Sequence, residues 1–261
     1  MIIVSAVDDP AVVEKALELG AYGYIVKPLK PSEVIINISS ALRRQRLELE
    51  SRLTRQNLEQ EIESRTAKLR EALESVVKVI AQTVESRDPY TAGHQMRVAK
   101  LASAIAQEMG YTAEKIKGIQ MAGTIHDLGK ISVPAEILSK STRLTDIEFA
   151  LIKTHPQVGY DILKDIDFPW PVAEITYQHH ERIDGSGYPR GLKRDVILPE
   201  ARIMAVADVV EAMASYRPYR PALGIDAALD EILKNKGKTY DQEVVEACLS
   251  IFRKRKFKFS D

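Results

Sequence analysis

Cysteine and histidine are scarce in this chain of 261 residues, and neither sign of charge is in excess. The single cysteine, Cys248, has no partner for an intramolecular disulfide, which excludes the disulfide-rich scaffolds of small secreted domains. The 37 basic and 37 acidic side chains cancel. No overall field therefore attracts nucleic acid or anionic lipid, and we expect neither as a partner.

Long apolar runs are absent as well. No stretch approaches the ~18 uninterrupted apolar residues of a membrane helix, and residues 1–9 lack the basic start of a secretory signal peptide. Hydrophobic residues still make up 45% of the chain and charged residues 28%, which excludes collagen-like and wholly disordered chains. We expect a cytoplasmic protein with a folded core.

The chain begins with a partial α/β pattern over residues 1–42. Residues 2–4 and 24–26 are predicted strands, and Asp9 followed by proline is a typical start for a helix between them. Two strands are too few for an independently stable sheet. This segment is therefore not expected to form a complete domain.

Residues 43–75 contain no glycine or proline and are rich in Glu, Arg, Leu and Gln, which predicts a long solvent-exposed helix. Ile62, Leu69 and Val76 recur every seven residues, although Arg55 and Arg65 fall on the same seam. The spacing favours a parallel coiled-coil linker with a register break, and hence a homodimer. A lone connecting helix is the alternative.

Beyond this linker the chain is apolar with helical spacing and shows no convincing strand pattern. Thr112 is a typical helix cap, and the helix that it begins is predicted to end at Gly129. We predict an all-helical domain over residues 76–252 and a basic tail over residues 253–261. The fold class is therefore mainly α.

All five histidines lie between positions 94 and 180. Helical spacing turns four of them toward the core, because each follows or precedes apolar residues at steps of three or four. His155, for example, follows Ile152 and Phe149 at steps of three. A lone histidine on an apolar face is more often a core residue, but four together favour a metal site. The four are His94, His126, His155 and His179.

Two aspartates strengthen the metal hypothesis. Asp127 adjoins His126 at a predicted helix end, and Asp208 interrupts an apolar run over residues 203–210. A buried carboxylate without a partner costs several kcal/mol, so Asp208 needs a cation nearby. Imidazole and carboxylate ligands suit Zn, Mn, Fe or Ni. Because the five histidines and these two aspartates make seven candidates, more than the ligands of one ion, we predict two divalent ions bridged by Asp127, an arrangement suited to phosphoryl transfer.

Two motifs carry a specific resemblance. HDLGK at residues 126–130 is similar to the HD motif of metal-dependent phosphohydrolases, and HHERIDGSGYP at residues 179–189 resembles the HD-GYP signature. The resemblance spans about residues 75–250 and includes RPYR at residues 217–220. HD-GYP proteins hydrolyse the phosphodiester bond of the bacterial second messenger cyclic di-GMP, giving linear pGpG and in some members GMP.

The resemblance also implies residue roles. A metal-activated hydroxide would attack phosphorus, and Lys130 would bind the substrate and stabilise charge on its phosphoryl oxygens. Arg217 and Arg220 would hold the phosphates, although a solvated surface pair is the alternative. Tyr188 would line the pocket or contact a protein partner. The implied metal ligands are His94, His126, Asp127, His155, His179, His180 and Asp208.

One position departs from the family pattern. Some members carry a glutamate one turn before the first histidine as a ligand for a third metal, whereas this chain has Tyr90. We therefore expect a dinuclear centre and pGpG rather than GMP as the end product. The alternatives are a cyclic di-GMP receptor with little turnover, which Tyr90 favours, and a phosphohydrolase of another cyclic dinucleotide or nucleotide.

The first segment resembles the C-terminal end of a response-regulator receiver domain of two-component signalling. The resemblance rests on VSA at residues 4–6, GAYGY at residues 20–24 and VKP at residues 26–28. The part that would carry the phospho-acceptor aspartate is not in this sequence. We expect a remnant that cannot be phosphorylated, or a chain whose true start lies upstream.

Overall fold

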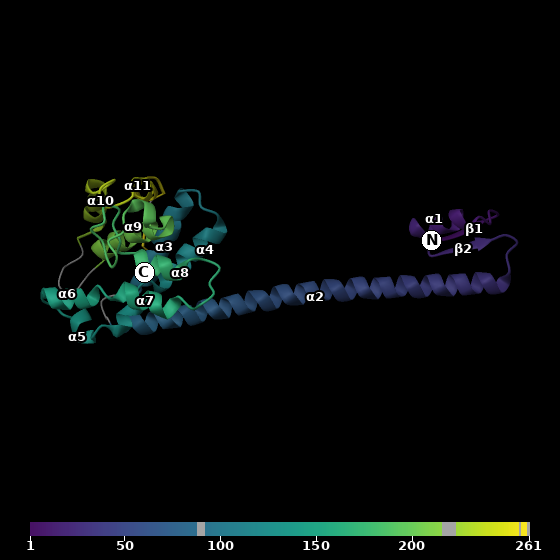
Figure 1. Ribbon diagram of the computed structural model, residues 1–261, viewed down its shortest axis with the longest axis horizontal. Coiled ribbons are helices and arrows are strands. Elements are labelled where there is room, and N and C mark those ends of the chain that lie inside the picture. The colour runs from purple at the N-terminus through teal and green to yellow at the C-terminus, as the bar shows by residue number, and fades with distance from the viewer. Residues whose placement is uncertain (88–91, 216–222, 256, 260–261) are drawn as a thin grey trace. The chain divides into compact units, whose positions relative to one another are not determined.

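The computed structural model describes residues 1–87, 92–215, 223–255 and 257–259 (Figure 1). The chain divides into two compact units, Met1–Ala72 and Leu73–Asp261. Helices dominate both, which confirms the mainly α class. None of the helices that the structure describes combines the length and apolar character needed to cross a bilayer.

The first unit contains the predicted strands and the helix between them. Strands β1 (Ile2–Ser5) and β2 (Gly23–Val26) pair in parallel, with Val4 opposite Ile25. Helix α1 (Pro10–Glu18) connects them, and the Asp9 side chain caps it by accepting a hydrogen bond from the backbone N–H of Ala11 at 2.9 Å. The strand and helix predictions are confirmed here, whereas the likeness to a receiver domain stays a prediction.

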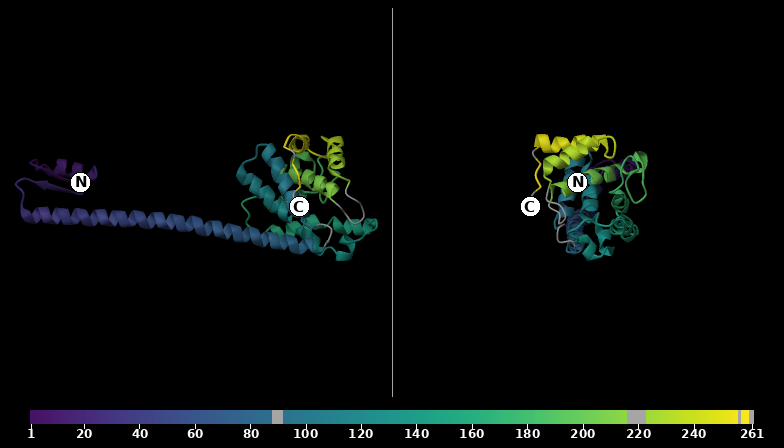
Figure 2. Two further views of the ribbon diagram at one scale, coloured as in Figure 1. Left: turned by 180° about the vertical axis from the view of Figure 1, so that it is seen from behind. Right: turned by 90° about the vertical axis from the view of Figure 1, so that its left-hand side faces the viewer.

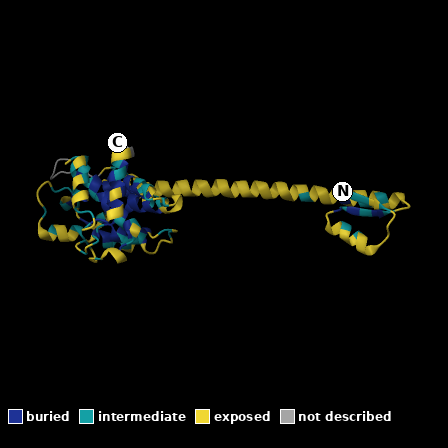
Figure 3. Cartoon of the chain, turned by 90° about the horizontal axis from the view of Figure 1, so that it is seen from above, coloured by how far each residue is buried: buried dark blue, intermediate teal, exposed yellow. Residues whose placement is uncertain are grey.

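Helix α2 (Pro31–Glu85) runs without a break through the predicted linker and into the second unit. Charged and polar residues dominate its middle, where the side chains are exposed (Figure 3). The apolar side chains on this stretch are exposed too, including Leu49, Ile62 and Leu69. Near its end the helix has buried apolar side chains, because Ala81 and Val84 belong to the core of the second unit.

The core of the second unit is formed by packed helices (Figure 2). Three of these helices each contribute a fully buried side chain, namely Leu101, Ile119 and Ile203. A Cβ at Gly123 would lie 2.7 Å from the Cα of Ala99, so glycine is required where two of these helices approach most closely. The central helices are α3 (His94–Glu108), α4 (Ala113–Ile125), α8 (Val172–Gln178) and α9 (Pro199–Ala214).

Shorter elements complete this unit, and the described residues from 73 onward form no strand beyond isolated bridges. They are η1 (Leu128–Ser132), α5 (Ala135–Leu138), α6 (Asp146–Ile152), α7 (His155–Leu163), η2 (Arg194–Val196), α10 (Ile225–Lys234) and α11 (Gln242–Arg255). Helix α11 thus extends into the basic tail, and Phe257 and Phe259 beyond it pack around Phe252. Cys248 is fully buried.

Two helix predictions were wrong. The helix that Thr112 caps ends at Ile125 rather than at Gly129, because the chain tightens into the 3-10 turn η1 after Asp127. His155 and Phe149 do not share a helix face, since α6 ends at Ile152 and His155 begins α7. His155 is nevertheless buried, so the face argument reached the right burial for the wrong reason.

Candidate metal centre

The structure brings all seven predicted ligand residues together in the second unit. Four of the histidines stand at helix ends and are 2% exposed or less. His94 is the first residue of α3, which the chain enters through Gly93 in the left-handed region, at φ +73°. The ligand set comprises His94, His126, Asp127, His155, His179, His180 and Asp208.

Hydrogen bonds on Nδ1 fix how four of the imidazole rings point. The Nδ1–H groups of His126, His155 and His179 donate to backbone carbonyl oxygens three residues earlier, at 2.8, 2.7 and 2.5 Å. The Nδ1–H of His94 donates to the carboxylate of Glu211. In the rings of His126, His155 and His179, Nε2 is left as the acceptor that faces the centre, which is the tautomer that a metal ligand requires. The Nε2 of His94 lies 3.2 Å from Asp208 Oδ1.

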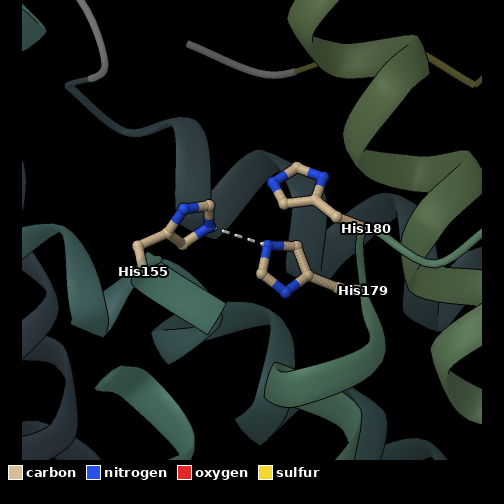
Figure 4. A group of neighbouring side chains, drawn as sticks. All are labelled: His155, His179 and His180. Carbon is tan, nitrogen blue, oxygen red and sulfur yellow. Dashed lines mark hydrogen bonds between the residues drawn. The ribbon is translucent and has the colours of Figure 1, made fainter. Parts of the chain in front are cut away.

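The ligands form two clusters that share one carboxylate. Asp127 stands between them: its Oδ2 lies 3.6 Å from His126 Nε2, and its Oδ1 lies 3.3 Å from His155 Nε2. The first cluster is His94, His126 and Asp208, and the second is His155, His179 and His180. Figure 4 shows the three rings of the second cluster turned toward one another.

Unpaired acceptors test whether a cation fits here. The buried Nε2 of His126 has no hydrogen-bond partner among the residues that the structure describes. The Nε2 atoms of His155 and His179 lie 3.2 Å apart, with both lone pairs facing inward because both Nδ1 atoms carry the proton. Such an arrangement is unfavourable unless a cation accepts the lone pairs. The residues therefore fit divalent cations, and the donor set suits first-row transition metals.

The protonation states of Asp127, His155 and His179 agree with this fit. Burial would raise the pKa of the Asp127 carboxyl, but Lys130 and the surrounding histidines hold that pKa well below its ordinary value. Burial lowers the pKa of His155 to about 4 and that of His179 to about 3. Near neutral pH the carboxylate is therefore ionised and these imidazoles are neutral, as metal ligation requires.

Lys130 and Gly129 explain how η1 presents Asp127. The Nζ of Lys130 lies 2.7 Å from Asp127 Oδ2. A Cβ at Gly129 would lie 1.9 Å from the carbonyl oxygen of His155, so only glycine permits η1 to pack against the start of α7. This close packing places the two clusters side by side. Arg217, Arg220 and Tyr90 lie outside the described residues.

Glu211 was missed by the sequence analysis, although it is fully buried one turn after Asp208 on α9. Besides its bond with His94, it accepts hydrogen bonds from Arg97 Nε and Ser215 Oγ, each at 2.7 Å. Burial would raise its pKa, but these partners lower the pKa to about 2. The available signal was a second acid three residues after Asp208 on the same apolar helix.

Glu85, the last residue of α2, also acts on the first cluster. Its buried carboxylate accepts hydrogen bonds from the backbone N–H groups of Gly93 at 3.0 Å and Gln95 at 2.9 Å. These residues flank His94 at the start of α3, where N–H groups lack partners within the helix. Glu85 therefore holds the backbone that positions His94.

The loop after His180 is held over the second cluster. Glu181 accepts backbone hydrogen bonds from Arg190 and Leu192, both at 2.8 Å. A Cβ at Gly187 would lie 2.5 Å from the carbonyl oxygen of His180, so this approach also requires glycine. As a result, the Tyr188 ring lies against His180, with the ring centroids 4.6 Å apart.

Known proteins are similar to this chain in sequence and in fold. The HD domain family matches residues 78–244. The cyclic di-GMP phosphodiesterase response regulator RpfG of Xanthomonas campestris pv. campestris is 35% identical over 251 residues, which cover 95% of this chain and 66% of RpfG. A cyclic di-GMP phosphodiesterase of Thermotoga maritima is 37% identical over 258 residues, which cover 95% of this chain and 70% of that protein.

This chain thus spans about two thirds of the length of these relatives. Among solved structures, the HDG"Y"P protein Bd1817 of Bdellovibrio bacteriovorus matches with a TM-score of 0.52 and 22% identity, over 61% of this chain and 51% of that one. It has the same helical fold. With the family match covering most of the second unit and the ligand set assembled there, the chain belongs to the HD domain family.

Proposed function

We propose that this protein is a cytoplasmic phosphodiesterase that hydrolyses cyclic di-GMP to linear pGpG at a dinuclear His/Asp centre. One observation carries the reaction class: Asp127 directs one carboxylate oxygen to each of two ligand clusters, beside Lys130. Paired metal sites of this kind suit displacement at phosphorus. The substrate follows from the relatives, two of which are named cyclic di-GMP phosphodiesterases.

Each group of side chains has a separate role in the proposed hydrolysis. Bound divalent cations, either Fe, Mn, Ni or Zn, would supply Lewis acidity and lower the pKa of water in the site. Asp127 orients both clusters, and the ammonium of Lys130 stabilises negative charge on the phosphoryl oxygens. The Nδ1–H bonds keep the rings fixed, so little reorganisation accompanies the reaction. Arg217 and Arg220 are proposed to hold the substrate phosphates.

The remaining segments are assigned supporting roles. Residues 76–252 form the hydrolase domain, and residues 43–75 pair with a second copy as a coiled coil, for which the exposed Ile62 and Leu69 provide the seam. Residues 1–42 are a receiver-like segment. Sedimentation of the full chain should give a dimer, and Leu69→Glu should shift it to monomer; a monomeric wild-type chain would contradict the pairing.

Turnover of cyclic di-GMP tests the function. The purified chain is loaded anaerobically with Mn or Fe, the products are separated by chromatography, and bound metal is counted. We expect pGpG, two ions per chain, and a loss of about 1,000-fold in rate for Asp127→Ala. Tight binding without turnover would overturn the enzyme in favour of a receptor. Three ions with GMP as product would overturn the dinuclear centre.

A further inference from the structure

A pocket of about 280 Å³ opens beside the metal centre, between the Tyr188 loop and α10. His180 forms part of its wall, so a group bound there adjoins the second ligand cluster. Pockets for drug-sized ligands measure ~300–1,000 Å³. This one is therefore suited to a single ring system rather than to a whole cyclic dinucleotide.

One edge of the pocket is an oriented carboxylate. Glu231 and Asn235 lie one turn apart at the end of α10, and Asn235 Nδ2 donates to Glu231 Oε1 at 2.8 Å. Glu231 Oε2 has no hydrogen-bond or ion-pair partner among the residues that the structure describes. A carboxylate held in this way can accept two neighbouring N–H groups from a ligand.

A guanidinium and two aromatic rings complete the lining. Arg182 Cζ lies 5.2 Å from the centroid of the Tyr240 ring, and Arg182 Nη1 donates to the carbonyl oxygen of Glu181 at 3.1 Å. These contacts anchor the side chain and leave further N–H donors for a ligand. Tyr188 adds an aromatic face, and such faces bind nucleic-acid bases by stacking.

This chemistry matches one base. Guanine carries the neighbouring donors N1–H and N2–H₂ on one edge and the acceptors O6 and N7 beside them. Glu231 complements the donors, and Arg182 complements the acceptors, which arginine binds with two parallel hydrogen bonds. Adenine would instead place its N1 lone pair against the carboxylate, which is repulsive.

We propose that this pocket binds a guanine base of the cyclic dinucleotide, and that Glu231 selects guanine over adenine. The inference rests on the proposed function for the identity of the substrate. It adds the recognition of the base to the recognition of the phosphates, through residues that do not contact the reacting phosphorus.

Steady-state kinetics of the metal-loaded full chain test the proposal on three substrates: cyclic di-GMP, cyclic di-AMP and bis(p-nitrophenyl) phosphate, which has no base. We expect Glu231→Gln to raise the KM for cyclic di-GMP by about 10–100-fold, as loss of hydrogen bonds to a charged group predicts. The kcat should stay near that of the wild type. The KM for cyclic di-AMP should fall, because the amide no longer repels the N1 lone pair of adenine, and hydrolysis of the base-free ester should not change.

Asp230→Asn is the matched control, because it neutralises an exposed acid at the neighbouring position of α10. It should leave all three substrates unaffected. An unchanged KM for cyclic di-GMP in Glu231→Gln, or an equal rise for cyclic di-AMP, would overturn the proposal.

Calorimetric binding separates this proposal from the proposed function. If the wild-type chain binds cyclic di-GMP without hydrolysing it, the phosphodiesterase fails while the pocket is still tested. In that case Glu231→Gln should weaken the binding of cyclic di-GMP by the same about 10–100-fold. An unaltered Kd would overturn the guanine assignment.

Discussion

The middle of α2 and the metal centre use the same acidic and basic side chains in opposite surroundings. On α2, Arg55 and Glu59 form an ion pair of 2.9 Å with both side chains more than half exposed. In the centre, Glu211 forms a pair of equal type with Arg97 at 2.7 Å, but its carboxylate is fully buried. Water screens the first pair, whereas it does not reach the buried carboxylate of the second.

This difference separates charges that keep a helix solvated from charges that fix a site. The pKa values of Glu211, Asp127 and His94 all lie far from their ordinary values, because these groups are buried among charged partners. Burial alone would lower the pKa of His94, yet its hydrogen bonds to Asp208 and Glu211 raise it to about 9. Changes in the centre should therefore have much larger effects than changes on α2.

Glu211→Ala should give the largest effect on stability. It leaves His94 and Arg97 without their buried partner, and breaking a buried pair from one side costs about 3–5 kcal/mol. Urea denaturation of the metal-free protein measures this loss. Metal titration should show affinity reduced by about 10–100-fold, because Glu211 orients a ligand without binding the ion. A loss of unfolding free energy below about 1 kcal/mol, which is the contribution expected of an exposed ion pair, would contradict the conclusion that the buried charges matter more than those on α2.

Acid should destabilise the metal-free protein next most strongly. His155 titrates at about 4 in the folded state against 6.5 as the reference value. The unfolded chain therefore takes up the proton first as the pH falls, and stability present above pH 6.5 is lost progressively toward pH 4, by about 3 kcal/mol for this residue.

His94 affects the stability of the protein over a different range of pH. Its folded pKa is raised, so its contribution is complete below pH 6.5 and is lost as the pH rises through about 9. Urea denaturation across both windows checks the two signs. His155→Gln is the control that should reduce the acid-side loss, and an unchanged acid limb in that variant would show that other groups cause it.

Glu85→Ala should produce an intermediate effect. It removes the acceptor of two backbone N–H groups at the start of α3, and we expect a loss of about 2 kcal/mol in the free energy of unfolding. Because His94 belongs to the first cluster, metal binding to the first cluster should weaken more than metal binding to the second cluster, which contains His179. Glu74→Ala, at an exposed position of the same helix, is the matched control. Equal weakening of both metals would contradict the role assigned to Glu85.

Arg55→Ala should have the smallest effect, below about 0.5 kcal/mol, because the pair with Glu59 is exposed. Thermal unfolding in low and high salt checks this value. Arg55 lies seven residues before Ile62, on the seam of the proposed coiled coil. A loss as large as that of Glu85→Ala would therefore mean that pairing with the second copy buries this position, and the comparison would then hold only for the isolated chain.

Helical periodicity predicted the helical class and the burial of His94, His126 and His179, because it reports which side chains face the core. The full set of ligand positions was instead implied by the resemblance of two motifs to the HD-GYP family. Periodicity failed where the chain leaves a regular helix. The end of α4 before Asp127 and the separate start of α7 at His155 depend on close packing at Gly129, which periodicity does not encode. Glu85 and Glu211 were missed because their partners lie far away in the sequence or on another helix.

The shared ligand set has a consequence for folding. With its single cysteine buried, the chain has no disulfide, yet ions bound in the first cluster would join His94 to Asp208 and close the loop of residues 94–208. Closing so long a loop restricts the unfolded ensemble much as a covalent cross-link does. This cross-link exists only while the ion is bound, so the thermal stability of the domain should follow the concentration of free metal.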